Sequence, residues 1–334
     1  AGRGGPVAPT EGLCPFARAL VCELARESET AAVFTTACDQ MRRAAELFRL
    51  RWPGRRAFLM NVPATWQTPA AMQMYVAELR RLGEFLVSLG GQAPTDEKLA
   101  EVAIAYDDAR RSLLAERPGL SAKQFARKLA EFNRGIETAR EAPAIGDPSP
   151  LKGEGGPKGR VRVTNTEEAT ESSIKPAEPV PQAIPLAIVG GPLLAGQMEV
   201  FDIVERLGGR IVLDATEFGE ISLPAPIDRE LLARDSLAAL AQAYFAVIPH
   251  PMRRPDSLLG EYLARELPRR GVRGLLLHRQ LWCDLWHGQL PRIRSLTRLP
   301  VLDIDVADED ADFGRQAGRI QAFMEMVSTE GNRE

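Results

Sequence analysis

Short apolar runs that alternate with helical patterns constrain the fold of this chain more than any other feature of its 334 residues. In the C-terminal half, runs rich in Leu, Ile and Val are each followed by a segment whose apolar residues recur at helical spacing. The expected strands are Leu186–Gly190, Arg210–Asp214, Val272–Leu277 and Val301–Ile304. The expected helices are Gln197–Leu207, Asp228–Tyr244, Pro255–Arg270, Leu285–Thr297 and Phe313–Val327. This alternation predicts βαβ units and a parallel sheet that helices cover on both faces.

The N-terminal half shows the same alternation with fewer strands. Two apolar runs, Ala31–Thr36 and Arg56–Pro63, end at polar or proline residues, as buried parallel strands do. Helix start signals follow them, because Thr68, Thr95 and Ser121 are residue types that cap helices and each precedes an amphipathic segment. We therefore predict the α/β class, with two doubly wound parallel-sheet domains.

A segment of low complexity separates the two halves. Residues 142–185 are rich in Pro, Gly, Ser and Glu, and they cannot bury enough apolar surface to offset their ordering entropy. The GEGGPKG motif within them is not a phosphate loop, since no strand precedes it and GK[ST] is absent. We predict an N-terminal α/β domain over residues 1–141, a disordered linker over residues 142–185 and a C-terminal α/β domain over residues 186–328.

The composition excludes several classes of protein. A formal net charge of −3 gives no overall attraction to nucleic acid or to an anionic membrane surface. Four cysteines at uneven spacing are not the framework of a disulfide-rich secreted domain. No apolar run approaches the roughly 20 residues of a membrane span, and the first residues lack the apolar centre of a signal peptide. We therefore expect a cytoplasmic protein with no nucleic-acid or membrane partner.

Three of the four cysteines lie where an α/β sheet binds its ligands. Cys38 and Cys283 each follow an expected strand, and Cys14 precedes a proline that fits the first turn of a helix. A helix N-terminus presents unpaired amides and the positive end of the helix dipole, so we expect the pKa of these thiols to be lowered. Cys22 points about 80° away from Cys14 on the same expected helix, and we interpret it as a core residue.

The spacing of the cysteines leaves several interpretations open. Zinc bound by three cysteines and either His278 or His287 is one, although structural zinc sites use pairs of closely spaced ligands. A cubane iron–sulfur cluster with three cysteine ligands is another, and it would leave one iron open to substrate. Unrelated buried cysteines are the third interpretation, and spacing alone favours it.

Five segments carry a more specific signal. They read GLCPFARAL, FTTACDQMRR, IVGGPLLAGQMEVFDIVERLGGRIVLDATEFGE, LWCDLWHGQLPRIR and RIQAFMEMV, and they cover most of both domains. Together they resemble the 2-hydroxyacyl-CoA dehydratase / benzoyl-CoA reductase subunit family. The resemblance implies two flavodoxin-like domains with a [4Fe-4S] cluster between them, bound by Cys14, Cys38 and Cys283.

The resemblance also implies a reaction and partners. In the family, an electron is added to the thioester carbonyl of an acyl-CoA substrate, and the resulting ketyl radical expels the 2-hydroxyl group. An ATP-dependent iron–sulfur activator protein supplies the electron, and it must be a separate chain because this sequence contains no P-loop. A homologous sister subunit or a second copy of this chain completes a dimer. Family members have a longer segment before the Cys-Pro motif, so we expect the N-terminal domain to lack its first strand and helix.

Other polar residues near the cysteines receive weaker assignments. His287 follows Cys283 by four residues on one helix face, and we take it as the candidate catalytic proton carrier, with a structural histidine as the alternative. Asp39 and Asp284 fit the dipole of a first helical turn better than acid–base catalysis. Arg42 and Arg43 fit a solvated helix face better than a site for CoA phosphates.

Three functions follow from these observations. The favoured one is the iron–sulfur subunit of a 2-hydroxyacyl-CoA dehydratase, a lyase. The second is a related reductase subunit, which acts on an aromatic acyl-CoA or on a small molecule. The third is a non-catalytic partner or electron-transfer subunit. The sequence does not indicate which acyl group is bound.

Overall fold

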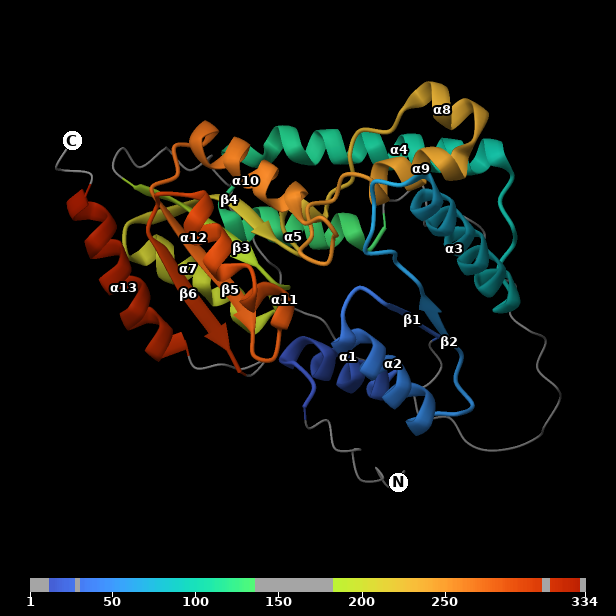
Figure 1. The fold of residues 1–334 in the computed structure, drawn as a ribbon, viewed down its shortest axis with the longest axis horizontal. Coiled ribbons are helices and arrows are strands. Elements are labelled where there is room, and N and C mark those ends of the chain that lie inside the picture. The colour runs from blue at the N-terminus through green and yellow to red at the C-terminus, as the bar shows by residue number, and fades with distance from the viewer. Residues whose placement is uncertain (1–11, 28–30, 136–182, 308–312, 331–334) are drawn as a thin grey trace, which may run out of the picture.

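The computed structural model describes residues 12–27, 31–135, 183–307 and 313–330, which form two parallel β-sheets with surrounding helices (Figure 1). The α/β class is thereby confirmed. Most of the expected linker lies outside the described residues, but its last two residues belong to the first strand of the larger sheet, β3 (Ile184–Gly190). No helix in these described ranges is long and apolar enough to cross a membrane.

The larger sheet contains four parallel strands in the order β4-β3-β5-β6. The strands after β3 are β4 (Gly209–Thr216), β5 (Gly274–Gln280) and β6 (Val301–Val306). All four expected strands are therefore present, although β5 ends three residues later than expected. In consequence, Cys283 lies three residues after the strand rather than six.

Seven α-helices accompany these strands within the described ranges. They are α7 (Glu199–Arg206), α8 (Arg229–Arg234), α9 (Ser236–Phe245), α10 (Ser257–Arg269), α11 (Asp284–His287), α12 (Leu290–Leu296) and α13 (Phe313–Glu330). The expectation of single helices over residues 228–244 and 285–297 was wrong. Asp235 has an extended backbone and caps α9 by accepting the Ala238 N–H, and Pro291 starts a new helix after Gly288.

Both faces of the larger sheet are buried. On one face, Leu186, Ile188 and Ile304 pack with residues of α7 and α13. On the other, Leu213 and Leu277 pack with residues of α10, α11 and α12. Burial on both faces explains why these strands appear in the sequence as continuous apolar runs.

The smaller sheet consists of β1 (Ala32–Thr35) and β2 (Ala57–Met60), paired in parallel. Helices α1 (Pro15–Arg26) and α2 (Asp39–Arg51) pack on it around Phe34 and Phe48, whose ring centroids are 5.5 Å apart. The chain continues through α3 (Pro69–Ser88), α4 (Asp96–Glu116) and α5 (Ala122–Asn133). The expected caps of these three helices are confirmed, because Thr68, Thr95 and Ser121 each accept a backbone N–H of the first turn.

A helix from each half of the chain packs against elements of the other half. From the N-terminal half, α5 packs against β4 and α7, so that Ala122 belongs to the core of the larger sheet. From the C-terminal half, α9 packs against α3, where Phe245 stacks on Tyr75 at a centroid distance of 4.6 Å. In Figure 1, α4 runs from the α9 side to the larger sheet. The domain boundaries at residues 141 and 186 stay a prediction.

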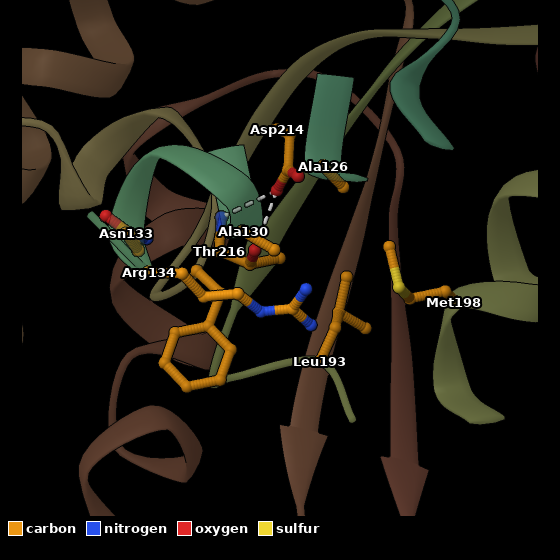
Figure 2. Close-up of a pocket in the computed structure, with 9 residues that line it drawn as sticks. Ala126, Ala130, Asn133, Arg134, Leu193, Met198, Asp214 and Thr216 are labelled. Carbon is orange, nitrogen blue, oxygen red and sulfur yellow. Dashed lines mark hydrogen bonds between the residues drawn. The ribbon is translucent and has the colours of Figure 1, made fainter. Parts of the chain in front are cut away.

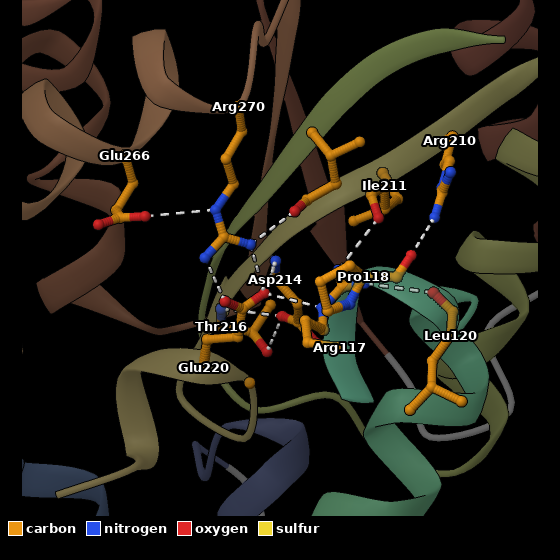
Figure 3. Close-up of polar contacts among 12 residues, drawn as sticks. Arg117, Pro118, Leu120, Arg210, Ile211, Asp214, Thr216, Glu220, Glu266 and Arg270 are labelled. Atoms are coloured by element: carbon orange, nitrogen blue, oxygen red, sulfur yellow. Dashed lines mark hydrogen bonds and ion pairs between the residues drawn. The ribbon is translucent and has the colours of Figure 1, made fainter. Parts of the chain in front are cut away.

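A buried ion-pair network fixes the loop that follows β4 (Figure 3). The Glu220 carboxylate accepts from Arg117 Nε at 3.0 Å and from Arg270 Nη2 at 2.6 Å. Arg117 also donates to the carbonyl oxygen of Ile211 at 3.1 Å. Arg117, at the end of α4, and Arg270, at the end of α10, thereby hold the residues between Thr216 and Glu220 in one position.

Candidate functional site

A cavity of about 580 Å³ lies at the carboxyl ends of both sheets. Its walls include residues that follow strands, namely Thr36 after β1, Asn61 after β2, Glu217 after β4 and Trp282 after β5. Polar groups gather there because the carboxyl edge of a parallel sheet is where loops of several βα units meet. The cavity therefore belongs to both halves of the chain.

Three cysteines line this cavity, and each is the N-cap residue of a helix. Cys14 caps α1, Cys38 caps α2 and Cys283 caps α11, as the sequence predicted. The Ala17 N–H donates to Cys14 Sγ at 3.4 Å, and Gln40 Oε1 accepts the N–H of Cys14 at 2.9 Å. The second contact links α1 to α2, so the N-terminal ends of these helices, which carry Cys14 and Cys38, are held together.

The expectation that helix N-termini lower the pKa of these thiols was wrong. Burial raises the pKa of Cys14 and Cys38, and it raises that of Cys283 to about 12. Amide hydrogen bonds oppose this change but are the smaller effect, and the Glu217 carboxylate raises all three values further. The thiols are therefore protonated and neutral at neutral pH unless a cationic group binds between them.

The other sulfur and imidazole candidates lie outside the cavity. Cys22 is half-buried on α1 and is not part of the core that packs there. His287 ends α11 with its side chain exposed, and it does not line the cavity. His278 is fully buried in β5, and neither of its ring nitrogens has a partner in the described part of the chain. Burial lowers the pKa of His278 to about 4.

A hydrogen-bonded group that the sequence did not predict lies at the cavity. His250 Nε2 lies 3.0 Å from Glu217 Oε1, and the indole N–H of Trp286 donates to the same oxygen at 2.5 Å. Burial alone would raise the pKa of Glu217, but the charge and hydrogen bond of His250 and the hydrogen bond of Trp286 lower it. Glu217 directly follows β4, so the rule that selected the cysteines could have found it. His250 follows no strand and carried no such signal.

Two further observations concern the rim of the cavity. Asp39, Arg42, Asp284 and Arg254 contribute charges of both signs there. Trp282 is 61 % exposed and has a φ of 68°, the only positive φ of a non-glycine residue in the described ranges. Such a backbone is unusual for a bulky side chain, and it costs conformational energy.

The three thiols face one cavity without converging on a single point. Among the residues that the structure describes, no three His, Cys, Asp or Glu side chains are arranged to bind one metal ion. A cubane cluster spreads its thiolate ligands over several metal atoms, and a wide cavity with three thiols from three loops fits such a group.

These features define a class, an α/β protein with two parallel sheets and a three-cysteine cavity at their carboxyl edge. A family model described as 2-hydroxyglutaryl-CoA dehydratase, D-component, matches residues 9–137 and 157–327. The chain belongs to this family, and the resemblance that the motifs indicated is confirmed. The matched ranges include all three cysteines of the cavity and also Glu217 and His250.

A curated relative shows a more local similarity. The chain is similar to a benzoyl-CoA reductase subunit of Thauera aromatica, with 29 % identity over 79 residues. This stretch covers 24 % of the chain and 20 % of the relative. The chain is thus similar both to a dehydratase component and to a reductase subunit.

Proposed function

We propose that this chain is the iron–sulfur subunit of a 2-hydroxyacyl-CoA dehydratase-type enzyme, and that Cys14, Cys38 and Cys283 bind a [4Fe-4S] cluster. The observation that carries the proposal is the meeting of three thiols from separate loops in one cavity of about 580 Å³. The family supports the reaction, because its name describes a dehydratase component. The order β4-β3-β5-β6 is that of a flavodoxin-like sheet without its last strand, which supports the fold that we infer for this domain.

The proposed reaction removes water from a 2-hydroxyacyl-CoA through a ketyl radical. When bound, the cluster would supply one electron and an open iron that acts as a Lewis acid. Dehydration leaves the overall oxidation level of the substrate unchanged, so the electron is recovered after each turnover and is not consumed. We infer from the family that an ATP-dependent activator protein supplies the electron, and that it is a separate chain, since this sequence contains no P-loop. We infer that a sister subunit or a second copy of the chain completes the enzyme in the cytoplasm.

Glu217 is the residue that we place against the substrate. Its Oε1 accepts both His250 and Trp286, whereas no partner of Oε2 occurs in the described part of the chain. The Met252 N–H donates to Nδ1 of His250 at 3.1 Å, so the hydrogen on Nε2 faces Glu217. The pair thus holds an ionised carboxylate whose free oxygen can accept a hydrogen bond from the 2-hydroxyl group. His287, which we predicted for proton transfer, is exposed and less well placed.

The reductase-type alternative is supported by the local similarity to a benzoyl-CoA reductase subunit. Both alternatives use the same cysteines, so the structure of the cavity does not separate them. Their substrates do: a dehydratase forms an enoyl-CoA from a 2-hydroxyacyl-CoA, and a reductase acts on an aromatic acyl-CoA. A non-catalytic partner subunit would turn over neither substrate.

Anaerobic purification with iron and sulfide analysis tests the proposal. We expect about four iron and four sulfide per chain. Cys14→Ser, Cys38→Ser and Cys283→Ser should each lower this content, and Cys22→Ser should leave it unchanged. Zinc in place of iron, or an equal loss in Cys22→Ser, would exclude the assigned ligands. Turnover of the two acyl-CoA classes with a sister subunit, an activator and ATP then separates the remaining functions.

A further inference from the structure

A second cavity, of about 270 Å³, lies beside the first at the carboxyl ends of β3 and β4 (Figure 2). The loop after β4 separates the two, because Glu217 lines the cysteine cavity while Thr216 and Phe218 line the second one. The ring of Phe16, which lines the cysteine cavity, contacts the ring of Phe218 edge to face at a centroid distance of 5.6 Å. This contact also separates the two cavities. The second cavity shares no lining residue with the cysteine cavity.

The walls of the second cavity are mostly apolar. The apolar residues that line it are Ala126 and Ala130 of α5 together with Leu193, Met198 and Phe218. A water molecule occupies about 30 Å³ in the liquid, so the space would hold roughly nine of them. The cavity is open to solvent, since Ala130 is exposed and Phe218 is 46 % exposed, and an apolar group that covers its alkyl and aromatic walls removes them from water.

Two charged residues enter this apolar space. Arg134 is an exposed residue at the end of α5, its guanidinium points into the cavity in Figure 2, and no hydrogen bond or ion pair of that group occurs within the described residues. Asp214 is 1 % exposed and accepts the N–H and the hydroxyl of Thr216, both at Oδ1. Its Oδ2 has no partner in the same described ranges. The Arg134 guanidinium and the Oδ2 atom of Asp214 are therefore available to a ligand that carries an anionic group and an apolar body.

We propose that the second cavity binds a short-chain carboxylate, with the carboxylate against Arg134 and the alkyl chain between α5, Leu193 and Phe218. The guanidinium fork matches a carboxylate in two parallel hydrogen bonds, a geometry that an ammonium or hydroxyl ligand cannot use. The site is distinct from the cluster-binding cavity, and it does not rest on the function proposed above. A ligand with an additional hydroxyl group would place that donor on Asp214.

Isothermal titration of the full-length chain with hexanoate, hexan-1-ol and hexylamine tests the proposal. These three probes share the alkyl chain and differ in the head group. We expect hexanoate to bind at least tenfold more tightly than the other two. Arg134→Gln, which keeps a polar side chain but removes its charge, should weaken hexanoate at least tenfold and leave hexan-1-ol unchanged. Ala130→Leu should fill the space and abolish binding of all three.

Two further measurements separate this proposal from that of the cluster. Cys38→Ser should lose iron but retain hexanoate binding, whereas Arg134→Gln should retain iron. Thermal midpoints of the ligand-free variants show whether each one is folded. Equal binding of hexylamine and hexanoate, or unchanged hexanoate binding by Arg134→Gln, would overturn the proposal. No binding of hexanoate by a folded chain would overturn it as well.

Discussion

The two sides of the cysteine cavity are built differently. On the C-terminal side, Cys283 and Glu217 follow strands of a four-stranded sheet that is buried on both faces. On the N-terminal side, Cys14 and Cys38 cap helices that flank a two-stranded sheet, in which Val33 is 47 % exposed. The first side rests on a large core and a buried ion-pair network, and the second rests on one small core and a few hydrogen bonds. We therefore expect the C-terminal side to be the rigid scaffold and the N-terminal side to adjust when a group binds between them.

The largest effect should come from removing the centre of the C-terminal ion-pair network. Glu220→Ala leaves the buried guanidinium of Arg117 without a carboxylate partner, and it leaves the partly buried Arg270 with Glu266 alone. Breaking such a buried pair typically costs about 3–5 kcal/mol of unfolding free energy. Urea denaturation of the variant measures this loss.

A matched control lies on the N-terminal side. Glu23 pairs with Arg26 on the surface of α1, where both side chains are more than half exposed. Glu23→Ala should therefore change the unfolding free energy by less than about 1 kcal/mol. Similar losses in Glu220→Ala and Glu23→Ala would contradict the idea that the network supports the scaffold. If Glu220→Ala does not fold, Glu220→Gln, which keeps the volume of the side chain, allows the same comparison.

The second effect is a dependence of stability on pH that arises in the larger sheet. Burial, opposed by the hydrogen bonds of Thr216, raises the pKa of Asp214 from 3.8 to about 6. A carboxyl group whose pKa rises on folding stabilises the fold below its unfolded pKa, and this contribution is lost as the pH rises through the folded value. The loss between about pH 4 and pH 6 amounts to about 3 kcal/mol.

Asp214→Asn isolates this effect, because the amide does not titrate and its oxygen can still accept from Thr216. Chemical denaturation at a series of pH values should show the variant gaining stability relative to the wild type as the pH rises from 4 to 6.5. A difference that stays constant over this range would show that burial does not perturb Asp214.

The third prediction is a substitution that should raise the unfolding free energy. Trp282 adopts a left-handed backbone with a φ of 68°, and its side chain is 61 % exposed, so it gains little from burial. Trp282→Gly should relieve about 1–2 kcal/mol of strain and raise the unfolding free energy. Trp282→Phe keeps a bulky side chain in the same turn and should show no such gain. Loss of stability in Trp282→Gly would mean that the indole makes contacts worth more than the strain.

The same contrast between the two sides explains how far the sequence could predict the structure. The buried strands of the larger sheet, such as β3 and β5, form continuous apolar runs, so their positions in the chain and their parallel direction could be predicted. The exchange of α5 and α9 between the halves could not, since amphipathic helices do not encode which surface they cover. The cysteines were found from their position after strands and before helices. Their raised pKa values depend on burial, and His250 reaches Glu217 only through tertiary structure.

The smallest effect concerns the support of the N-terminal cysteines. Gln40 of α2 accepts the backbone N–H of Cys14, and this hydrogen bond joins the two N-terminal cysteine loops. Gln40→Ala leaves this partly buried amide without its acceptor, so we expect a loss of about 1 kcal/mol in unfolding free energy. Gln40→Glu keeps an acceptor oxygen and should restore most of it. Gln321→Ala, which removes an exposed contact on α13, serves as the control and should have almost no effect. If Gln40→Ala were as harmless as Gln321→Ala, the contact between α1 and α2 would depend on their apolar core and not on this hydrogen bond. The N-terminal cysteines would then be still freer to move toward a bound group than Cys283 is.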